Sequence, residues 1–157
     1  MELNQSLAQI KEFLNSEKDG KIIRIEFSNE DKIDSVNDDT NIFLESSIND
    51  IEAAMWLLDQ APQLVFALAG KINNEFDDFA TILLDFKDGK TVIVSSNWVT
   101  PNHQRSCNIV STNGKMSFDL TKVKTDIQNQ SNDNAKKVAE AAFLSSQKGI
   151  PIYLDLK

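Results

Sequence analysis

Polar side chains collect just ahead of an apolar helix in the middle of the sequence. Residues 49–58 contain neither Gly nor Pro, and apolar residues recur three or four positions apart, which predicts a helix with one buried face. The start carries short polar side chains that can accept hydrogen bonds from the first turn, namely Ser46, Ser47, Asn49 and Asp50. Glu45 precedes Asn49 by four residues, so both side chains can face the same space. Asn49 can hold a hydroxyl group by hydrogen bonds, but an amide does not titrate and cannot act as an acid or base.

A second group of candidate residues follows a predicted strand. The ring of Trp98 can stack on the face of a sugar or another ring, and the guanidinium of Arg105 can pair with a phosphate. His103, the only histidine of the sequence, lies between them. With this one His and the single Cys107, the sequence predicts no metal site.

Each of these patterns also has a purely structural interpretation, which the residues alone leave open. Residues 45–50 can be no more than the capped start of an amphipathic helix. Trp98 can serve in core or interface packing, and His103 can be an exposed loop residue. The acidic segment at 29–41 reads as a surface loop, because it lacks the turn glycine and terminal Glu of an EF-hand calcium loop.

The composition predicts one domain that covers residues 1–157. This length suits a single compact unit, and 41% hydrophobic residues suffice for a core. The formal net charge of −8 argues against a nucleic-acid partner, because a surface that binds a duplex needs clustered Lys and Arg. No apolar run approaches the roughly 20 residues that cross a bilayer, and the amino terminus lacks a signal-peptide pattern. We therefore expect no membrane partner and a cytoplasmic location, where the single Cys107 forms no intrachain disulfide.

Hydrophobic periodicity and turn signals predict an α+β fold. The expected helices cover residues 4–16, 49–60 and 134–147. The expected strands cover residues 21–28, 63–69, 78–86, 91–98, 105–111, 115–119 and 152–156, and residues 123–134 are expected to form a loop. Turns at 87–90 and 112–114 join neighbouring strands as hairpins. Because tight turns cannot join parallel strands, we expect a mostly antiparallel open sheet with the helices on one face.

Two of the predicted strands carry apolar side chains on both sides of the pleat. They are residues 64–68 and 79–84, and such a pattern is typical of strands that are buried on both faces. The three helices can cover one face of the sheet. A second copy of the sheet is the simplest cover for the other face, because most soluble oligomers are symmetric, although loops can also cover it. We therefore expect a homo-oligomer, a dimer or higher, that forms through the sheet face.

The start of the central helix resembles a segment of the glucose-fructose oxidoreductase/inositol dehydrogenase (Gfo/Idh/MocA) family of NAD(P)-dependent enzymes. That segment reads Leu-Asp-x-Gly-x-His-Asp-Ile-Asp and precedes an apolar helix that contains Trp-Leu. Residues 44–52 and 56–57 stand at the matching places. Glu45 replaces the family's Asp, and Asn49 replaces the family's His, which lies beside the substrate carbon and assists proton transfer.

Further stretches are similar to the second domain of the same family. Residues 97–105 are similar to a Ser-Trp-x-Thr-Pro-x-Lys-x-Arg segment of members that oxidise nucleotide-linked sugars, with His103 in place of the Lys. The helix followed by Gly-Lys-Ile at 4–22 is similar to the start of that domain, and Gly-Ile-Pro-Ile at 149–152 is similar to its end. The resemblance therefore covers most of residues 4–157.

The resemblance implies a substrate-side domain. The family's nucleotide-binding half, with its Glu-Lys-Pro segment and catalytic Lys, has no counterpart in this sequence, which contains no Gly-x-Gly-x-x-Gly. The family implies NAD(P) as the cofactor, a sugar or sugar-nucleotide ligand and oligomerisation through the open face of the sheet. By family position, Glu45 and Asn49 are the candidate catalytic residues. The candidate substrate-binding residues are Glu45, Asn49, Asp50, Trp98 and Arg105, and we expect no cofactor-binding residue in this chain.

Two functions are compatible with these observations. The first is the substrate-side and oligomerisation domain of an NAD(P)-dependent sugar or sugar-nucleotide oxidoreductase, inactive without a Rossmann domain. The alternative is a non-catalytic homodimeric module, ligand-binding or structural, derived from the same family. The replacement of the family's His by Asn49 favours the alternative, so the sequence leaves open whether the chain works as an enzyme.

Overall fold

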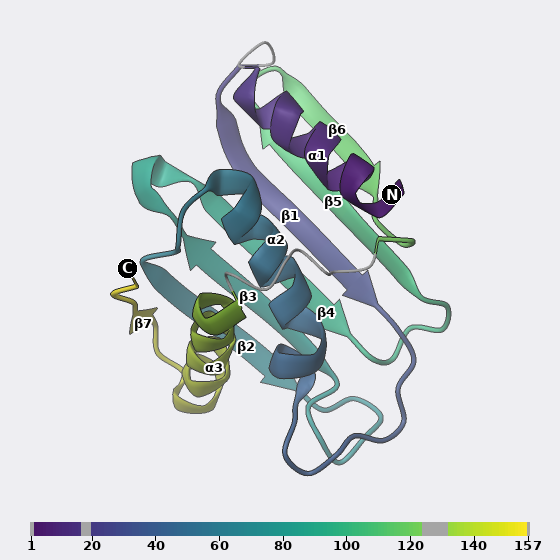
Figure 1. Cartoon of the computed structure of the whole chain (residues 1–157). Coiled ribbons are helices and arrows are strands. Elements are labelled where there is room, and N and C mark those ends of the chain that lie inside the picture. The colour runs from purple at the N-terminus through teal and green to yellow at the C-terminus, as the bar shows by residue number, and fades with distance from the viewer. Residues whose placement is uncertain (1, 17–19, 124–131, 157) are drawn as a thin grey trace.

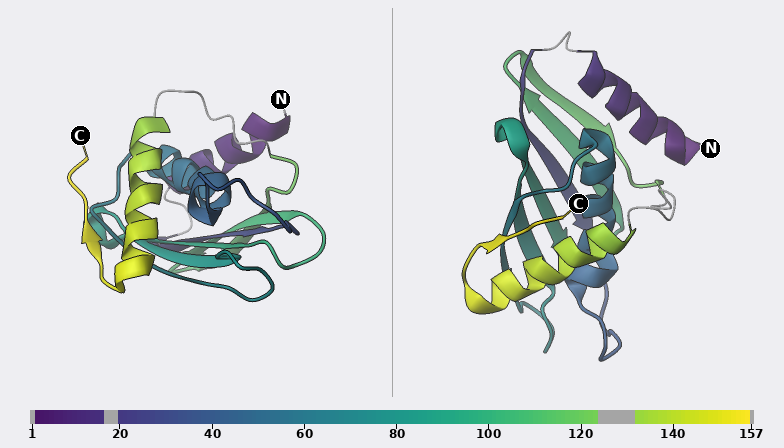
Figure 2. Two further views of the ribbon diagram at one scale, coloured as in Figure 1. Left: turned by 90° about the horizontal axis from the view of Figure 1, so that it is seen from below. Right: turned by 60° about the vertical axis from the view of Figure 1, so that its left-hand side comes forward.

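Seven strands form one open sheet, and three helices lie on one of its faces (Figures 1 and 2). The computed structural model describes residues 2–16, 20–123 and 132–156, to which these counts refer. The helices are α1 (Glu2–Asn15), α2 (Ile48–Leu58) and α3 (Asn132–Lys148). The strands are β1 (Ile22–Glu30), β2 (Leu64–Gly70), β3 (Phe79–Asp85), β4 (Thr91–Asn97), β5 (Gln104–Ser111), β6 (Gly114–Asp119) and β7 (Ile152–Tyr153). Within the described ranges, no helix combines the length and the apolar character needed to span a bilayer.

The strand order is β6-β5-β1-β4-β3-β2-β7, and each pair of neighbours is antiparallel except β1 with β4. The predicted hairpins are confirmed, because β3 pairs with β4 across a short 3₁₀ turn at Lys87–Gly89 and β5 pairs with β6 across residues 112–113. In the first turn Asp88 and Gly89 have φ of 66° and 74°, the left-handed conformation that a tight reversal often requires. The α+β class and the mostly antiparallel open sheet are also confirmed.

Strand β1 is inserted between β4 and β5, and this position creates the parallel pair. The register runs from Arg24 opposite Thr91 to Glu30 opposite Asn97, so β1 and β4 end at the same edge of the sheet. Past these ends, the N–H of Asp31 donates to the carbonyl oxygen of Asn97 at 3.0 Å. The segments that follow β1 and β4 are therefore held side by side.

The core lies between the sheet and the helices. Strand side chains that face the helices are buried, such as Phe27 in β1 and Ile82 in β3. Helix α2 meets the sheet with apolar residues at helical spacing, such as Ile51 and Met55. Burial of one such side chain stabilises a fold by about 1.5–3 kcal/mol, so packing rather than local propensity fixes where the helix lies.

The opposite face of the sheet has no helix over it among the described residues (Figure 2). On this face, β2 and β3 present apolar side chains that stay partly exposed, with Leu68 57% and Leu83 42% exposed. Strand β1 presents polar residues there instead, including Arg24 and Glu26, which form an ion pair at 2.8 Å. The apolar character of the open face is therefore concentrated on one half of the sheet.

Most elements lie within two residues of their predicted ranges, and two element boundaries differ by more. The central helix begins earlier than expected, because a π-helical turn at Phe43–Ser47 precedes α2. The last strand is shorter than the predicted 152–156, because β7 contains two residues that pair with the first two of β2. Tyr153 already pairs with Leu64, the first residue of β2, so β2 has no residue left to pair with an extension of β7 beyond Tyr153. The loop predicted at 123–134 lies mostly outside the described residues, and its last positions belong to α3.

Asp78 organises the loop that joins β2 to β3. Its Oδ1 accepts the N–H of Ile72 at 2.8 Å, and its Oδ2 accepts the N–H of Asn73 at 2.8 Å and that of Asn74 at 3.1 Å. The side-chain amide of Asn74 donates to the same oxygen at 3.2 Å. Burial by itself raises the pKa of this carboxyl group, but the four donors outweigh burial and hold the pKa of Asp78 below its usual 3.8. The loop therefore depends on an ionised carboxylate.

Replacement of Asp78 with Asn is expected to lower the free energy of unfolding by about 1–3 kcal/mol at neutral pH, because an NH₂ group then faces backbone donors. Since the folded pKa is lowered, the advantage of Asp78 is fully present above the pKa of the unfolded chain. The advantage shrinks as the pH falls below about 5 and is lost once the pH passes below the folded pKa. Urea unfolding across this pH range measures the effect. Asp88→Asn, in an exposed turn, is the matched control, and equal losses in the two variants contradict the role assigned to Asp78.

Candidate functional site

The π-helical turn at Phe43–Ser47 shapes the start of the central helix. The N–H of Ile48 donates to the carbonyl oxygen of Phe43, five residues back, which widens the turn relative to an α-helix. Ile42 and Phe43 anchor the turn in the core, where both side chains are fully buried. The side-chain oxygen of Asn41 accepts the N–H of Leu44 at 3.1 Å and so satisfies a donor that the helix leaves free.

The prediction that serine and asparagine side chains cap this helix is wrong, because the helix starts before them. No side-chain cap is formed at Ser47. Instead, Ser46 Oγ accepts the indole N–H of Trp98 at 2.8 Å, and Ser47 Oγ lies 2.9 Å from Ser96 Oγ in β4. The two hydroxyl groups therefore tie the helix start to the end of β4, and this contact fixes the height of the helix above the sheet.

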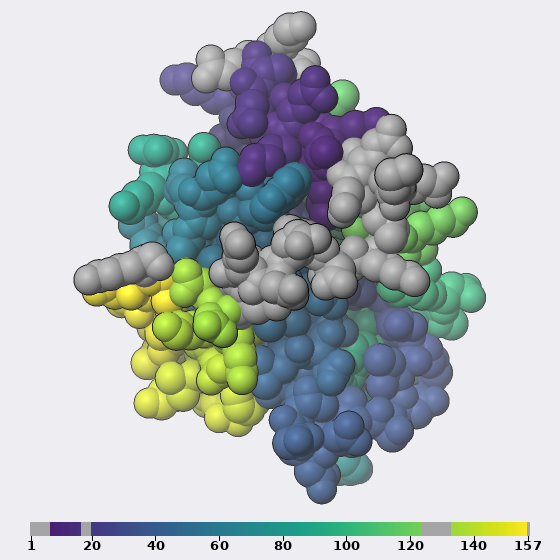
Figure 3. Space-filling view, in the orientation of Figure 1, coloured from purple at the N-terminus to yellow at the C-terminus, as the bar shows by residue number. Residues whose placement is uncertain are grey.

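A pocket of about 410 Å³ opens between this helix start and the segments that follow β1 and β4. Its polar lining consists of the carboxylates of Asp31 and Glu45, the amides of Asn29, Asn37 and Asn49, the hydroxyls of Ser35, Thr40 and Ser46, and the imidazole of His103. Its apolar lining consists of Ile33, Val36 and Trp98. In the space-filling view, the blue segment that follows β1 lies beside the start of α2 at the lower edge of the helical face (Figure 3). The volume falls within the usual range of small-molecule sites.

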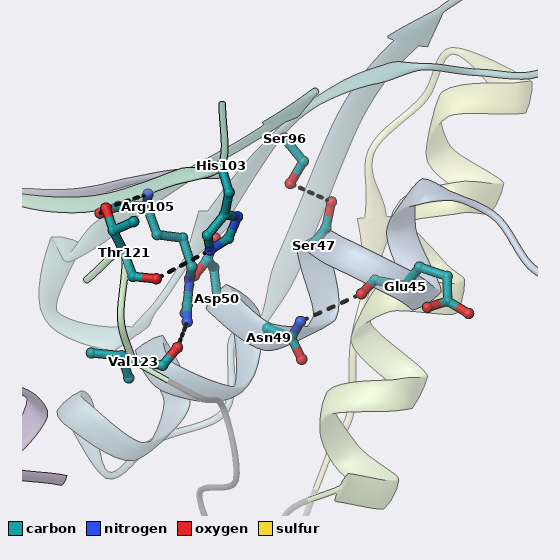
Figure 4. Close-up of polar contacts among 9 residues, drawn as sticks. All are labelled: Glu45, Ser47, Asn49, Asp50, Ser96, His103, Arg105, Thr121 and Val123. Carbon is teal, nitrogen blue, oxygen red and sulfur yellow. Dashed lines mark hydrogen bonds and ion pairs between the residues drawn. The ribbon is translucent and has the colours of Figure 1, made fainter. Parts of the chain in front are cut away.

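Glu45 and Asn49 share this pocket, as their spacing of four residues predicts. The Asn49 amide donates to the backbone oxygen of Glu45 at 3.4 Å (Figure 4). The Thr40 hydroxyl donates to Glu45 Oε1 at 3.3 Å. Glu45 is exposed and keeps a second carboxylate oxygen for a ligand, while Asn49 keeps its side-chain oxygen as an acceptor. Together they can hold the hydroxyl groups of a polyol.

Trp98 lines the pocket from the core side. Its side chain is 1% exposed, and its ring meets that of Phe76 at a centroid distance of 6.0 Å and an interplanar angle of 69°. Its indole N–H is already bonded to Ser46. The structure therefore places Trp98 in the core packing that the sequence left open, and a stacking role on a sugar stays a prediction.

Asp50 and Arg105 form a buried ion pair beside the pocket rather than in its lining (Figure 4). Nε of Arg105 donates to Asp50 Oδ1 at 2.9 Å, Nη2 donates to the same oxygen, and Nη1 donates to the carbonyl oxygen of Val123 at 3.2 Å. The two residues are 0% and 3% exposed. Burial raises the pKa of Asp50, and the charge and hydrogen bonds of Arg105 oppose this rise. The arginine that the sequence suggested for a phosphate is instead engaged inside the protein, and ligand contacts by either residue stay a prediction.

His103 lies at the pocket with both ring nitrogens near oxygen atoms. Nε2 is 3.1 Å from the carbonyl oxygen of Thr121, and Nδ1 is 3.6 Å from Asp31 Oδ2. In the neutral ring, an Nε2–H that donates to Thr121 leaves Nδ1 as the acceptor. The sequence suggested an exposed loop position, and the structure places this half-exposed ring in the wall of the pocket.

The described residues do not fit a dinucleotide cofactor. Such a site needs a glycine-rich turn between a strand and a helix, so that backbone N–H groups reach the phosphates. The connection from β1 to the π-helical turn, residues 31–42, contains no glycine, and the pocket wall there carries carboxylates.

Sequence reasoning missed most of the polar wall that comes from residues 29–40. That segment looked like an acidic surface loop, and it becomes a pocket wall because β1 lies next to β4. Hairpin signals reveal antiparallel neighbours in the sequence, but they carry no information on a parallel pair that is formed across three other elements. The one sequence feature that could have indicated a polar pocket wall was the high content of Asn, Asp and Ser in this segment.

The comparisons with known proteins agree with this fold. The model of the GFO/IDH/MocA C-terminal domain family matches residues 7–117. A myo-inositol dehydrogenase from Corynebacterium glutamicum ATCC 13032 superposes with a TM-score of 0.83 and 13% identity over 99% of this chain and 63% of that chain. A putative myo-inositol dehydrogenase from Sinorhizobium meliloti 1021 superposes with a TM-score of 0.81 and 15% identity, over 96% of this chain and 62% of that chain. The scyllo-inositol dehydrogenase from Lactobacillus casei, with bound NAD(H) and scyllo-inositol, has a TM-score of 0.77 and 14% identity, over 94% of this chain and 61% of that chain.

No curated protein matches the sequence. At these identities the solved structures establish the fold alone, and the chain spans less than two thirds of the length of each. The family model is the stronger finding, since it matches well over half of the chain and includes the helix start, β1 and β4. The resemblance stated from the sequence is thereby confirmed, and the chain belongs to the family of GFO/IDH/MocA C-terminal domains.

Proposed function

We propose that this chain is the substrate-side domain of an NAD(P)-dependent oxidoreductase that acts on a sugar or a related polyol. The observation that carries the proposal is the pocket of about 410 Å³ at the helix start, where carboxylates, amides and hydroxyl groups are mixed. A polyol presents several O–H groups that both donate and accept, so a mixed lining of this kind suits it. The family match supports the class of enzyme, and the structural neighbours named above include inositol dehydrogenases.

In this proposal the residues of the chain bind and orient the substrate, while a separate dinucleotide-binding domain carries the cofactor. Glu45 accepts a hydrogen bond from one substrate hydroxyl, and Asn49 holds another. Asn49 does not titrate, so a proton that leaves the substrate must go to Asp31, Glu45 or His103 in the pocket or to a group of the other domain. The hydrogen bonds of Ser46 with Trp98 and of Ser47 with Ser96 hold the helix start, and with it Glu45 and Asn49, against the end of β4.

The alternative function is a ligand-binding or structural module that performs no chemistry. One observation favours it, namely that Asn49 stands where the resembling enzymes have a titratable His. A purely structural module predicts no ligand, whereas the oxidoreductase domain and a ligand-binding module both predict polyol binding at the pocket. They differ in turnover, because the module binds without oxidising its ligand.

Titration with myo-inositol and glucose, followed by the NMR signals of the two tryptophan indoles, tests the binding. The indole of Trp98 is bonded to Ser46 in the pocket wall, so a bound polyol is expected to shift its signal in a saturable way. Trp56 is the internal reference, since its ring lies elsewhere, with Lys11 Nζ 4.4 Å from its centroid. Glu45→Ala is expected to weaken binding about fivefold or more by loss of a charged acceptor. If no polyol moves the Trp98 signal, the proposal is wrong.

Turnover then separates the two functions. The chain is combined with a dinucleotide-binding domain of the same family, and formation of NADH or NADPH is followed with each polyol that binds. Polyol-dependent reduction that is lost in Glu45→Ala supports the oxidoreductase. Binding without reduction, in a combination that forms a complex, supports the module.

We further propose that the open face of the sheet pairs with a second copy of the chain. Leu68 and Leu83 are exposed there, and the half-buried Phe66 and Phe79 lie on the same face of β2 and β3. Apolar patches of this kind on a protein surface commonly mark interfaces. Sedimentation at micromolar concentration is expected to give a dimer or a higher oligomer, and Leu68→Glu with Leu83→Glu is expected to give a monomer. A monomer in the unchanged protein contradicts this proposal.

We propose the cytoplasm as the location of the protein. Cys107 is buried and free in β5. Burial, together with the charge of Asp50, raises the pKa of its thiol to about 12, so the thiol stays protonated and unreactive. A single inert thiol suits a reducing compartment.

A further inference from the structure

The pocket at the start of α2 carries negative charge without a matching permanent cation. Asp31 and Glu45 both line it, whereas none of the lining residues that the structure describes is Lys or Arg. Lys32 follows Asp31 in the chain, but its Nζ lies 3.6 Å from the carboxylate of Asp34. The permanent charge among the lining residues is therefore that of the two carboxylates.

Arg105 does not compensate this charge. Its side chain is 3% exposed, and its guanidinium donates to Asp50 and to the carbonyl oxygen of Val123. The positive charge of Arg105 is thus balanced by Asp50 inside the protein. A phosphate or carboxylate that entered the pocket would meet Asp31 and Glu45 with no guanidinium to pair with.

We propose that the pocket selects polyols that bear a protonated amine, such as an amino sugar or an aminocyclitol, over neutral polyols of the same shape. The same charge disfavours polyols that carry a carboxylate or a phosphate on the ring. The inference rests on the proposed function of this pocket and names its substrate class. An ammonium group offers three donors and a positive charge, and the oxygens of Asp31 and Glu45 are acceptors of the opposite charge. The amides of Asn37 and Asn49 and the hydroxyl of Thr40 then serve the hydroxyl groups of the ligand.

The expected preference is moderate, because the pocket is open to water. Side-chain exposure at Asp31 is 43%, and Glu45 is exposed. Interactions between solvated charges a few ångströms apart are weak individually, and two carboxylates together favour an ammonium group about tenfold. Since the interaction is screened by ions, the preference is expected to fall as the salt concentration is raised.

The test compares four ligands of one ring shape against the full chain at pH 7 and low salt. They are glucosamine, N-acetylglucosamine, glucose and glucuronate, and binding is followed by the indole signals of Trp98 and of the reference Trp56. N-acetylglucosamine keeps the nitrogen and removes its charge, so it separates the effect of charge from that of shape. We expect glucosamine to bind about tenfold more tightly than glucose, which corresponds to about 1.4 kcal/mol. Glucuronate is expected to bind more weakly than glucose.

Two variants assign the preference to named carboxylates. Asp31→Asn and Glu45→Gln keep the shape of the pocket and remove one charge each, and the double variant is expected to bind glucosamine and glucose within about threefold of each other. Asp88→Asn is the matched control, since it removes one exposed carboxylate from the turn between β3 and β4. The dispersion of the amide signals reports whether each variant is folded.

Each outcome bears on the proposal. A preference for glucosamine that vanishes in the double variant and survives in Asp88→Asn supports it. Equal binding of glucosamine and glucose, or tighter binding of glucuronate, overturns the charge preference and leaves the proposed polyol site intact. If none of the four ligands shifts the Trp98 signal, both the preference and the proposed binding function are wrong.

Discussion

Replacement of Arg105 with Met is expected to lower the free energy of unfolding by about 3–5 kcal/mol, since it leaves the buried carboxylate of Asp50 without a counter-charge. Oδ1 of Asp50 accepts two hydrogen bonds from Arg105, and Oδ2 has no partner among the described residues. This carboxylate is 0% exposed and is therefore shielded from bulk solvent. The carbonyl oxygen of Val123 also loses its donor in the variant. Urea unfolding at neutral pH measures the loss.

A double-mutant cycle distinguishes the ion pair from general disruption of the core. Asp50→Leu alone leaves Arg105 charged and buried, so a loss of similar size is expected. The double variant Asp50→Leu with Arg105→Met removes both charges and is expected to lose less than either single variant. The partly exposed pair of Arg24 and Glu26 is the control, and Arg24→Met is expected to cost about 1 kcal/mol or less. Losses that simply add in the double variant contradict the assigned coupling.

Trp98→Ala is expected to cost about 3–5 kcal/mol and to weaken polyol binding at the same time. The ring is 1% exposed and packs edge-on against Phe76, so its removal leaves a large cavity under the pocket. The variant also frees Ser46 Oγ, which accepts the indole N–H in the unchanged protein. Urea unfolding gives the stability, and the amide signal of Asn49 reports polyol binding once the indole is gone.

Two further substitutions at tryptophan sharpen this result. Trp98→Phe keeps an aromatic ring and removes the N–H, so it is expected to cost less than the alanine variant, with about 1 kcal/mol from the lost hydrogen bond. Trp56→Ala removes the other tryptophan from a half-buried position, where a smaller loss is expected. Equal losses of unfolding free energy in Trp56→Ala and Trp98→Ala would contradict the assignment of Trp98 as the more deeply packed of the two rings.

The local elements of this fold can be predicted from the sequence because each has a local cause. The helix at 49–58 follows from apolar residues at helical spacing, and the pairing of β3 with β4 follows from the Asp88-Gly89 turn. The π-helical turn has no such local signal. Ile42 and Phe43 at its start are fully buried, and such burial depends on tertiary packing rather than on the local sequence.

The part of the site that lies in one local stretch of sequence could also be predicted. Glu45 and Asn49 lie in one local stretch, and their spacing of four residues placed them together correctly. Asp31 and His103 belong to different segments, and they meet because β1 pairs with β5 in a register that sets Glu30 opposite Gln104. The role of Arg105 could not be predicted either, because its partner Asp50 lies on another element and the sequence does not show that both side chains are buried.

The insertion of β1 between β4 and β5 has a consequence for how the protein is made. During synthesis β1 emerges early, whereas both of its partners belong to the second half of the chain. The hairpins of β3 with β4 and of β5 with β6 can form as soon as they are translated. They join into one sheet only when β1 pairs with β4 on one side and with β5 on the other. Contacts this distant in sequence slow folding. Until β4 and β5 have emerged, β1 has no partner strand, and unpaired strand edges of this kind invite aggregation.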